Sequence, residues 1–527
     1  MAVVASPITA EERAAGEELV RELPRLPAYP ALYQVNTRVR LRALGAELGR
    51  PAALDDIPDA ELDHWGEQGF GWVYFLGVWG TGEAGRGVSL TQPDWRRAFE
   101  ALLPDLQERD ICGSSFAVTA YAAHPAIGGN PALQRLRERL RRRGLRLMLD
   151  FVPNHMAPDH PWAQARPELF VQGSEEKLRQ QPANYLVVET GRGPMVLAHG
   201  RDPFFPGWPD TLQLDYGNPA AREAMRGELL TAAALCDGLR CDMAMLILPE
   251  VFERTWGIAA APFWPGTIQA VRAERPDFVF MAEVYWDLEW TMLQQGFDYA
   301  YDKTLYDRAV ARNGRGVRDH LRAGLDYQRH LVRFLENHDE PRAAGTFSWD
   351  VHQAAAVITF LSPGLRFFHQ GQFEGRRKHV SIHLNRAPRE EADPAVGAFY
   401  ASLLEVLKHS ALRAGTWRLL EPTAAWQGNW TWEGFVCFAW EGSGGEYLLG
   451  TVNFQPNQAQ CYVRLPHSTL AGRPHDLIDL LGPARYRREG DDLTGHGLYL
   501  DLPPWGFHLF SLEAAHGAGA IVQAAPS

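Results

Sequence analysis

The segment LMLDFVPNH, residues Leu147–His155, joins a run of apolar residues to a cluster of polar ones. Its apolar half has the composition of a buried strand in a parallel sheet, and such strands carry functional side chains at their carboxyl ends. A carboxylate such as Asp150 is costly to bury unless it has a partner or a task. The segment therefore predicts a parallel α/β fold with a site at the strand ends.

Three later segments repeat this design, and each ends an apolar run with charged or histidine side chains. They read GLRCDMAM from Gly238, FMAEVYW from Phe280 and FLENHDE from Phe334. Because parallel strands of a barrel end at one mouth, we expect Asp242, Glu283 and Asp339 to lie close together.

Strand-like apolar runs recur eight times in the first 370 residues or so, separated by helical patterns. They begin at Ala31, Gly71, Leu145, Gly238, Phe278, Phe297, Leu331 and Gly364. Eight β/α repeats fit a closed (β/α)8 TIM barrel, so the predicted fold class is α/β. The long segment before the Asn218-Pro219 helix start predicts a small subdomain inserted after strand 3. Short alternating runs after about Tyr400 predict a C-terminal antiparallel β-sandwich domain.

These patterns give a domain division. We predict an N-terminal helical segment at residues 1–30, the barrel at 31–152 and 218–400, the inserted subdomain at 153–217, the β-sandwich at 401–513 and a flexible tail at 514–527.

Charge and composition narrow the range of partners. The chain has 52 Lys and Arg against 64 Asp and Glu, a net charge of −12, which argues against nucleic acid as a partner. Five cysteines without C-x-x-C spacing indicate neither a zinc site nor a disulfide framework. No signal-peptide pattern and no uninterrupted apolar run of about 18 residues occurs, so we expect a cytoplasmic protein without a membrane segment. The basic run of residues 135–143 is better explained as a solvated helix face than as an anion site.

The polar clusters suggest a chemistry. Arg240 and Asp242 are two residues apart on a strand, so they project to the same side, and the arginine can hold the carboxylate ionised. Glycosidic cleavage needs two facing carboxylates, one to protonate the leaving oxygen and one to attack or stabilise the anomeric carbon. Asp242 and Glu283 fit these requirements.

Four motifs resemble the signature regions of the α-amylase family in order and spacing. They are DFVPNH at 150–155, GLRCDMA at 238–244, AEV at 282–284 and ENHDE at 336–340. That family has a barrel, a subdomain after strand three and a C-terminal β-sandwich, so the resemblance covers nearly the whole chain.

The resemblance implies a retaining glycosidase. Asp242 would be the nucleophile that forms a glycosyl-enzyme, and Glu283 the acid and base. Asp339 would bind hydroxyls of the donor sugar and Arg240 would position Asp242. The further substrate-binding residues implied are His155 and His338, with Asp150 and Asn154 in support.

Some residues depart from the family pattern. Phe116 stands where the family usually presents a tyrosine beneath the donor sugar, so stacking is kept and the hydroxyl is lost. The stretch MAMLILP after Asp242 lacks the Lys-His pair of polymer-degrading amylases. A structural calcium is not supported, because Asn154 alone supplies too few oxygens, and we expect no metal or other cofactor. Trp79 and Trp286, just past strand ends, are the aromatic residues predicted to line sugar subsites.

The sequence thus predicts an enzyme that hydrolyses or transfers α-linked glucosyl units of soluble oligosaccharides or disaccharides. A predominant glucanotransferase or transglucosidase is an alternative, because loop shape and water exclusion decide which acceptor reacts. A noncatalytic carbohydrate-binding barrel is a second alternative. It is less favoured, since a pure binder has no need of an acid and nucleophile pair.

Overall fold

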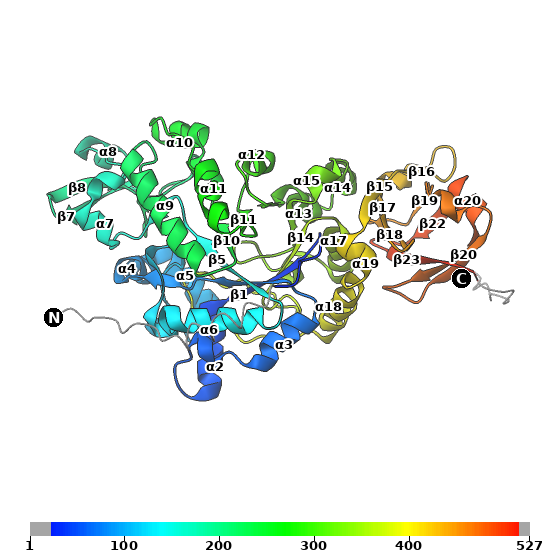
Figure 1. Ribbon diagram of the computed structural model, residues 1–527, viewed down its shortest axis with the longest axis horizontal. Helices are drawn as coiled ribbons and strands as arrows, with labels where there is room; N and C mark the ends of the chain where they lie inside the picture. The colour runs from blue at the N-terminus through cyan, green and yellow to red at the C-terminus, as the bar shows by residue number, and fades with distance from the viewer. Residues whose placement is uncertain (1–22, 516–527) are drawn as a thin grey trace.

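Eight parallel strands close into a barrel at the centre of the molecule (Figure 1). The computed structural model describes residues 23–515. Around the barrel the strands are β1 (Ala31–Asn36), β14 (Leu365–His369), β13 (Leu331–Arg333), β12 (Tyr299–Tyr301), β11 (Val279–Ala282), β10 (Gly238–Cys241), β5 (Arg146–Phe151) and β2 (Trp72–Leu76). Each of the eight predicted runs forms one of these strands, so the predicted (β/α)8 class is confirmed.

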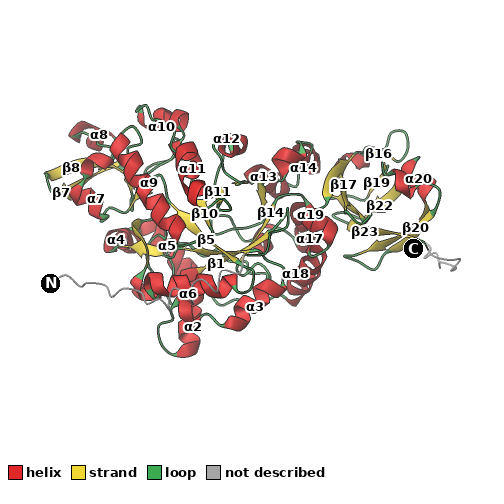
Figure 2. Ribbon diagram, viewed as in Figure 1, coloured by secondary structure: helices red, strands yellow, loops and turns green. Residues whose placement is uncertain are grey.

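Helices surround these strands (Figure 2). The longer ones are α2 (Thr37–Leu48), α3 (Asp59–Glu67), α4 (Glu83–Thr91), α5 (Pro93–Leu102), α6 (Gly129–Arg141), α9 (Pro219–Ala234), α10 (Pro249–Trp256), α11 (Trp264–Glu274), α13 (Lys303–Val310), α14 (Gly314–Leu321), α17 (Trp349–Leu361) and α18 (Pro394–Leu407), and the shorter ones include α12 (Glu289–Gln294), α15 (Leu325–Gln328) and α16 (Ala343–Thr346). Helix α9 begins as the sequence indicates, with the Asn218 side chain accepting from the N–H of Ala220 and Pro219 in the first turn.

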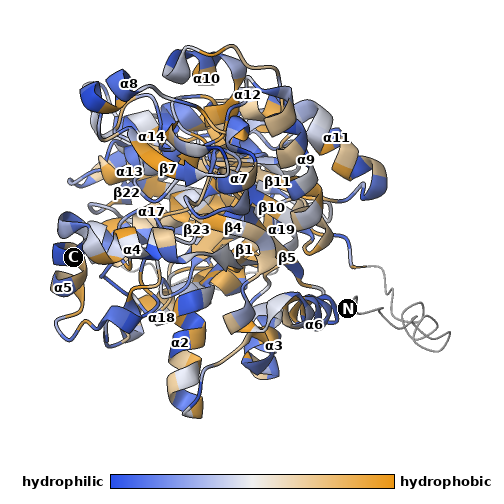
Figure 3. Ribbon diagram, turned by 90° about the vertical axis from the view of Figure 1, so that its left-hand side faces the viewer, coloured by the Kyte–Doolittle hydropathy of each residue, from blue (hydrophilic) through white to orange (hydrophobic). Residues whose placement is uncertain are grey.

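Residues 135–141 of the basic run lie on α6 and residues 142–143 directly follow it; the helix is largely hydrophilic in colour in Figure 3. Its leucines are buried. Arg137 and Arg141 pair with Asp237, directly before β10, and three other arginines pair with aspartates of the preceding segment. Three pairs follow one another at one-turn intervals: Arg135 with Asp55, Arg139 with Asp59, and Arg143 with Asp63. The positive charge of this helix face is therefore already neutralised within the chain.

The segment between β5 and α9 lies at one end of the molecule, near α10 (Figure 1). It contains β6 (His155–Met156), α7 (Pro161–Ala165), α8 (Glu175–Gln180), β7 (Tyr185–Thr190), β8 (Gly193–Ala198) and β9 (Leu212–Gln213). The first and last strands pair with each other, and β7 forms a hairpin with β8. A further small sheet, β3 (Trp79–Thr81) with β4 (Val118–Ala123), forms in the connection after β2.

Two antiparallel sheets form the C-terminal domain at the opposite end (Figure 1). One has the order β15 (Thr416–Leu420), β17 (Phe435–Glu441), β18 (Tyr447–Asn453), β23 (Phe507–Ala514), β20 (Pro474–Asp479) and β21 (Arg485–Glu489), and the other β16 (Pro422–Ala424), β19 (Ala459–Val463) and β22 (Leu498–Leu502). Short helices α19 (Ser410–Ala414) and α20 (Gly490–Thr494) flank strands of this domain.

Three predicted boundaries need correction or restriction. The division at residue 400 falls inside α18, whose Tyr400 hydroxyl lies 2.8 Å from His352 Nε2 of α17, so this helix packs with the barrel and the sheets begin at Thr416. Residues 23–30 of the predicted N-terminal helical segment contain no helix, and residues 1–22 lie outside the described part. The predicted tail begins at the last residue of β23, and residues 516–527 are also outside it. No helix within residues 23–515 has the length and hydropathy needed to cross a bilayer.

Candidate active site

The strand register brings the predicted polar residues together. On β10, Arg240 pairs with Asp150 of β5, and Cys241 pairs with Ala282 of β11. Asp242 and Glu283 directly follow these two strands, so both lie at the same level of the barrel mouth. Backbone hydrogen bonds hold them there, from the Asp242 N–H to the Phe151 carbonyl at 2.8 Å and from the Glu283 N–H to the Cys241 carbonyl at 3.0 Å.

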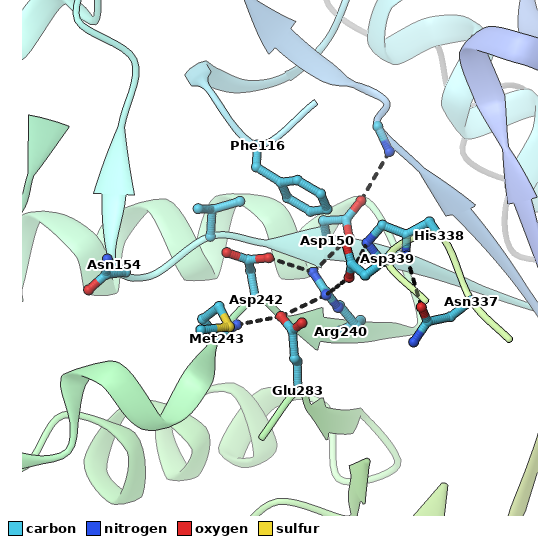
Figure 4. Close-up of polar contacts among 12 residues, drawn as sticks. Phe116, Asp150, Asn154, Arg240, Asp242, Met243, Glu283, Asn337, His338 and Asp339 are labelled. Atoms are coloured by element: carbon cyan, nitrogen blue, oxygen red, sulfur yellow. Dashed lines mark hydrogen bonds and ion pairs between the residues drawn. The ribbon is translucent and has the colours of Figure 1, made fainter. Parts of the chain in front are cut away.

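One fully buried guanidinium joins the acidic side chains (Figure 4). Arg240 Nη1 lies 2.8 Å from Asp242 Oδ1, and Nη2 lies 2.7 Å from Glu283 Oε2. Asp339, in the loop after β13, is 3.8 Å from Nη2, and Asp150 is 3.7 Å from Nη1. The structure therefore places Asp242, Glu283 and Asp339 around one cation, as the sequence predicts.

Glu283 is held at both oxygens. The Tyr285 hydroxyl donates to Oε1 at 2.8 Å, and the Met243 N–H donates to Oε2 at 2.7 Å. Met243 has a φ of 39°, a left-handed conformation that is uncommon for a residue with a side chain. This backbone conformation directs its N–H at Glu283, which is the kind of strain found at functional sites.

Burial separates the pKa values of Glu283 and Asp242. Burial raises the pKa of Glu283 above its ordinary range, and Arg240 opposes that shift. Burial raises the pKa of Asp242 as well, again against Arg240, by less than for Glu283. The Asp339 side chain is 40% exposed, whereas that of Glu283 is 4% exposed. The larger upward shift of the Glu283 pKa suits Glu283 to act as an acid and Asp242 to act as a carboxylate.

His338 and Phe116 lie over the same cluster. Gln34 Nε2 is 2.9 Å from His338 Nδ1, and because an amide nitrogen only donates, Nδ1 is the acceptor and Nε2 carries the proton. That Nε2 lies 3.1 Å from Asp339 Oδ2. Burial lowers the pKa of His338 to about 4, so the ring is neutral at pH 7. The Phe116 ring lies 5.2 Å from the Arg240 guanidinium and 5.5 Å from the His338 ring.

A cleft of about 710 Å³ opens beside Asp339. One wall comes from α5, with Trp95, Phe99 and Leu102, and another from residues 378–383. A cleft of this size with aromatic walls and one carboxylate is suited to a small polar ligand such as a sugar. None of these wall residues was predicted, because they gain their place only through the packing of α5 against the loop after β14.

Two of the remaining predicted residues lie on the inserted segment or next to it. His155 on β6 is 4% exposed, its ring lies 5.3 Å from that of Trp208 in a tilted arrangement, and burial lowers its pKa to about 3. Trp286 follows β11 and is half-buried, with its ring 5.1 Å from the exposed Phe204. Arg254 lies over both rings. Trp286 is thus accessible at the end of its strand, as a sugar-stacking residue must be.

The structure contradicts a direct sugar contact for Trp79. Its ring is 1% exposed, its Nε1 donates to the Asp150 carbonyl at 2.7 Å, and it packs edge-on against Tyr121. Asp150 is equally buried and accepts from the Tyr74 hydroxyl and the Gly77 N–H. Neither side chain lines the cleft beside Asp339. Asp150, like Arg240, is buried within the cluster of charged side chains.

Gln34, Tyr74 and Met243 were missed by the sequence reasoning. Gln34 is a polar residue inside the apolar run ALYQV, which was a usable signal. No sequence signal marks Tyr74 or Met243. The role of Tyr74 depends on its hydroxyl reaching a neighbouring strand, and that of Met243 depends on a local backbone conformation.

The Asn154 side chain, which the sequence analysis considered for calcium, forms hydrogen bonds within the protein. Asn154 Oδ1 already accepts from Gln213 Nε2 at 3.0 Å. Among residues 23–515, no group of three or more His, Cys, Asp or Glu side chains is placed to hold a metal ion.

An eight-stranded α/β barrel with convergent carboxylates at its mouth defines this protein as a (β/α)8-barrel enzyme. The family model of the alpha-amylase catalytic domain matches residues 117–393, more than half of the chain. The chain belongs to the α-amylase family.

Relatives agree with this assignment. Alpha-amylase MalA of Haloarcula japonica is 24% identical over 268 residues, which are 48% of this chain and 35% of that protein, so the match spans about a third of its length. The fold resembles that of the maltogenic alpha-amylase AmyB of Thermotoga neapolitana, with TM-score 0.65, 16% identity, and coverage of 93% of this chain and 99% of that one. It also resembles a Geobacillus thermoleovorans alpha-amylase complexed with acarbose, with TM-score 0.62, 17% identity, and coverage of 93% and 100%.

Proposed function

We propose that this protein is a retaining enzyme that acts on α-glucosides, hydrolysing or transferring glucosyl units of soluble oligosaccharides or disaccharides. The observation that carries the proposal is the placement of Asp242 and Glu283 on the two nitrogens of the buried Arg240, at 2.8 and 2.7 Å. Membership of the α-amylase family and the likeness to a fold that holds acarbose in a relative support the substrate class.

We assign different catalytic roles to the carboxyl groups of Glu283 and Asp242. Glu283, whose pKa burial raises, is the acid: it gives its proton to the glycosidic oxygen as the bond from that oxygen to the anomeric carbon breaks. Asp242, held ionised by Arg240, attacks the anomeric carbon from the opposite face. Glu283 then takes a proton from the acceptor, which displaces Asp242. Two inversions leave the α-configuration unchanged.

We assign binding of the donor sugar to the exposed side of the cluster. Asp339 and His338 border the cleft of about 710 Å³, and the Nε2 of the neutral His338 lies 3.1 Å from Asp339 Oδ2. Phe116 presents an aromatic face without a hydroxyl in the position that the family pattern gives to tyrosine. Arg240 and Asp150 hold the cluster without contacting the sugar.

Transfer to a second sugar is the alternative that one observation favours. Trp286 and Phe204 form an aromatic pair at the end of β11, and Phe204 is 63% exposed. An exposed aromatic pair is a stacking surface for a sugar ring, and an acceptor held there competes with water.

The exchange of Glu283 for glutamine tests the acid role. We expect Glu283→Gln to lower kcat/KM for maltotriose by about 1,000-fold, because a general acid contributes on this scale. For a 2,4-dinitrophenyl α-glucoside, whose leaving group needs no proton, we expect a much smaller loss. Steady-state kinetics with both substrates measure the difference.

Two outcomes would contradict the proposal. Equal losses for the two substrates would remove Glu283 from the acid role. A wild-type protein that converts no member of a panel of maltose, sucrose, trehalose, isomaltose and maltodextrins, while Glu283→Gln binds them equally well, would favour a noncatalytic barrel. Product chromatography on the same panel separates hydrolysis from transfer, and NMR of fresh product should show the α-anomer first.

The pH profile of kcat/KM should be bell-shaped, and the hydrogen bond from Tyr285 to Glu283 should influence the pH at which the alkaline limb falls. Activity needs protonated Glu283 and is lost as pH rises through its raised pKa, and it needs ionised Asp242 and is lost as pH falls through that pKa. The Tyr285 hydroxyl donates to the Glu283 carboxylate and so stabilises its ionised form. Tyr285→Phe should therefore move the alkaline limb to higher pH and leave the acid limb in place. An unmoved alkaline limb would show that another group sets it.

A further inference from the structure

A second cavity, of about 1530 Å³, lies along α2 and shares no lining residue with the cleft beside Asp339. In Figure 1, α2 extends away from the barrel at the lower edge of the molecule. Its inner face forms one wall of the cavity, residues 81–86 form a second, and residues 385–391, in the loop after β14, form a third. We call this space the arginine cavity.

Positive charge is concentrated in the arginine cavity. Eight arginines line it against three glutamates, in a chain whose net charge is −12. Four of these arginines have carboxylates within 4.0 Å: Arg42, Arg50, Arg86 and Arg386. The other four form no ion pair with any described residue: Arg38, Arg109, Arg376 and Arg389.

The three glutamates do not neutralise these four. Glu83 pairs with Arg86, and Glu390 accepts the backbone N–H of Arg377 at 2.9 Å. Glu391 is exposed at the rim. The contrast with α6 is informative, since each of the three arginines there that face the preceding segment has an aspartate. Within the described part of the chain, no aspartate or glutamate forms an ion pair with the four remaining arginines of the cavity.

Arg38 shows the consequence at one position. It is half-buried, and its guanidinium donates to neutral acceptors, the Gly113 carbonyl at 2.9 Å and the Thr81 hydroxyl at 3.0 Å, with Cys112 Sγ at 3.3 Å. Removing a guanidinium from water is costly without an anion beside it. These bonds fix its direction and leave its charge uncompensated.

A recess of about 250 Å³ continues the arginine cavity inward and shares six lining residues with it, including Val39 and Arg376. At its inner end, Arg342 Nε and His369 Nδ1 have no hydrogen-bond partner among the described residues, although these residues are only 6% and 8% exposed. Glu374, one of the two glutamates that line the recess, also has an unpartnered oxygen. Buried polar atoms without partners are rare, and a polar ligand would satisfy them.

We propose that the arginine cavity binds a small molecule that carries a phosphate group, either orthophosphate or the phosphate monoester of a sugar. A phosphate offers two charges and several acceptor oxygens, which match guanidinium donors in direction and number. The volume exceeds what a phosphate alone needs, and Ala43, Ala46, Ile127 and Pro388 give part of the wall an apolar character that a ligand body can cover.

Calorimetric titration of the full chain tests the proposal, with orthophosphate, glucose 1-phosphate, glucose 6-phosphate and uncharged methyl α-glucoside as probes at low salt. Each titration is repeated with saturating maltotriose in the Glu283→Gln background, so that the sugar cleft is filled. The double variant Arg376→Gln/Arg389→Gln removes two unpaired charges from the cavity. Its matched control, Arg179→Gln/Arg488→Gln, removes two arginines that form no ion pair on α8 and β21.

We expect phosphate-bearing probes to bind wild type and control alike, maltotriose to leave that binding unchanged, and the cavity variant to bind at least about tenfold more weakly. Tighter binding of the esters would identify a sugar phosphate as the ligand, and equal binding would identify orthophosphate. Absence of binding, equal binding to the cavity variant, or loss of binding when maltotriose is present would overturn the proposal.

Discussion

Replacement of Asp242 by alanine should lower kcat/KM on maltotriose by at least about 10,000-fold, the largest loss of activity that we expect from any single substitution. Asp242 is the carboxylate that Arg240 holds at 2.8 Å, and no other described carboxylate has the same place at the end of β10. The loss should reflect the missing nucleophile and not a damaged fold, so the far-ultraviolet spectrum should match that of the wild type.

Azide gives this prediction a stereochemical control. With α-glucosyl fluoride as substrate, azide can enter the space left by Asp242 and attack from the face opposite the leaving group, which gives β-glucosyl azide. In Glu283→Ala the glycosyl-enzyme still forms, and azide attacks it from the other face, which gives α-glucosyl azide. NMR of the two products measures this. The same anomer from both variants, or activity retained in Asp242→Ala, would contradict the assigned roles.

Replacement of Arg240 by methionine should be the most destabilising change in the barrel. Its guanidinium is fully buried between Asp150, Asp242 and Glu283, and removing one partner of a buried ion pair costs about 3–5 kcal/mol. Activity should fall as well, because Asp242 loses both its orientation and the charge that keeps it ionised.

The destabilisation by Arg240→Met should grow with pH. The folded-state pKa of Asp150 is already raised to about 6 with Arg240 present, and removal of the cation raises the folded-state pKa of each neighbouring carboxyl further. Groups with raised folded-state pKa values keep the protein stable when protonated and reduce its stability as pH rises. Urea unfolding midpoints at about pH 5 and about pH 8 should therefore differ more in the variant than in the wild type.

Arg318 provides the matched control. It is 3% exposed and donates to the backbone carbonyls of Glu433 and Phe435, with no carboxylate within 4.0 Å among the described residues. Arg318→Met should destabilise the protein by a similar amount at both pH values. A pH-independent loss in Arg240→Met would show that the carboxylates are not coupled to that cation.

Much of the barrel was predictable because its strands are short, apolar and bounded by polar ends. The run LRLMLDF, for example, forms β5 and places Asp150 at its end, and GLRC does the same for Asp242. The division at residue 400 was wrong because that residue lies inside α18. The buried residues Phe399, Tyr400 and Leu403 belong to one helix, and their apolar pattern in the sequence does not show where the barrel ends.

The sequence by itself determined the order of the eight strands and which residues end them, because buried strands need continuous apolar runs and polar groups must follow them. Tertiary structure decided which of those residues face the cleft. It buried the side chains of Trp79 and Asp150, gave Met243 a left-handed backbone that points its N–H at Glu283, and assembled the arginine cavity from segments that lie far apart in the chain. Exposure and charge balance depend on contacts between distant segments, and no local pattern of residues specifies those contacts.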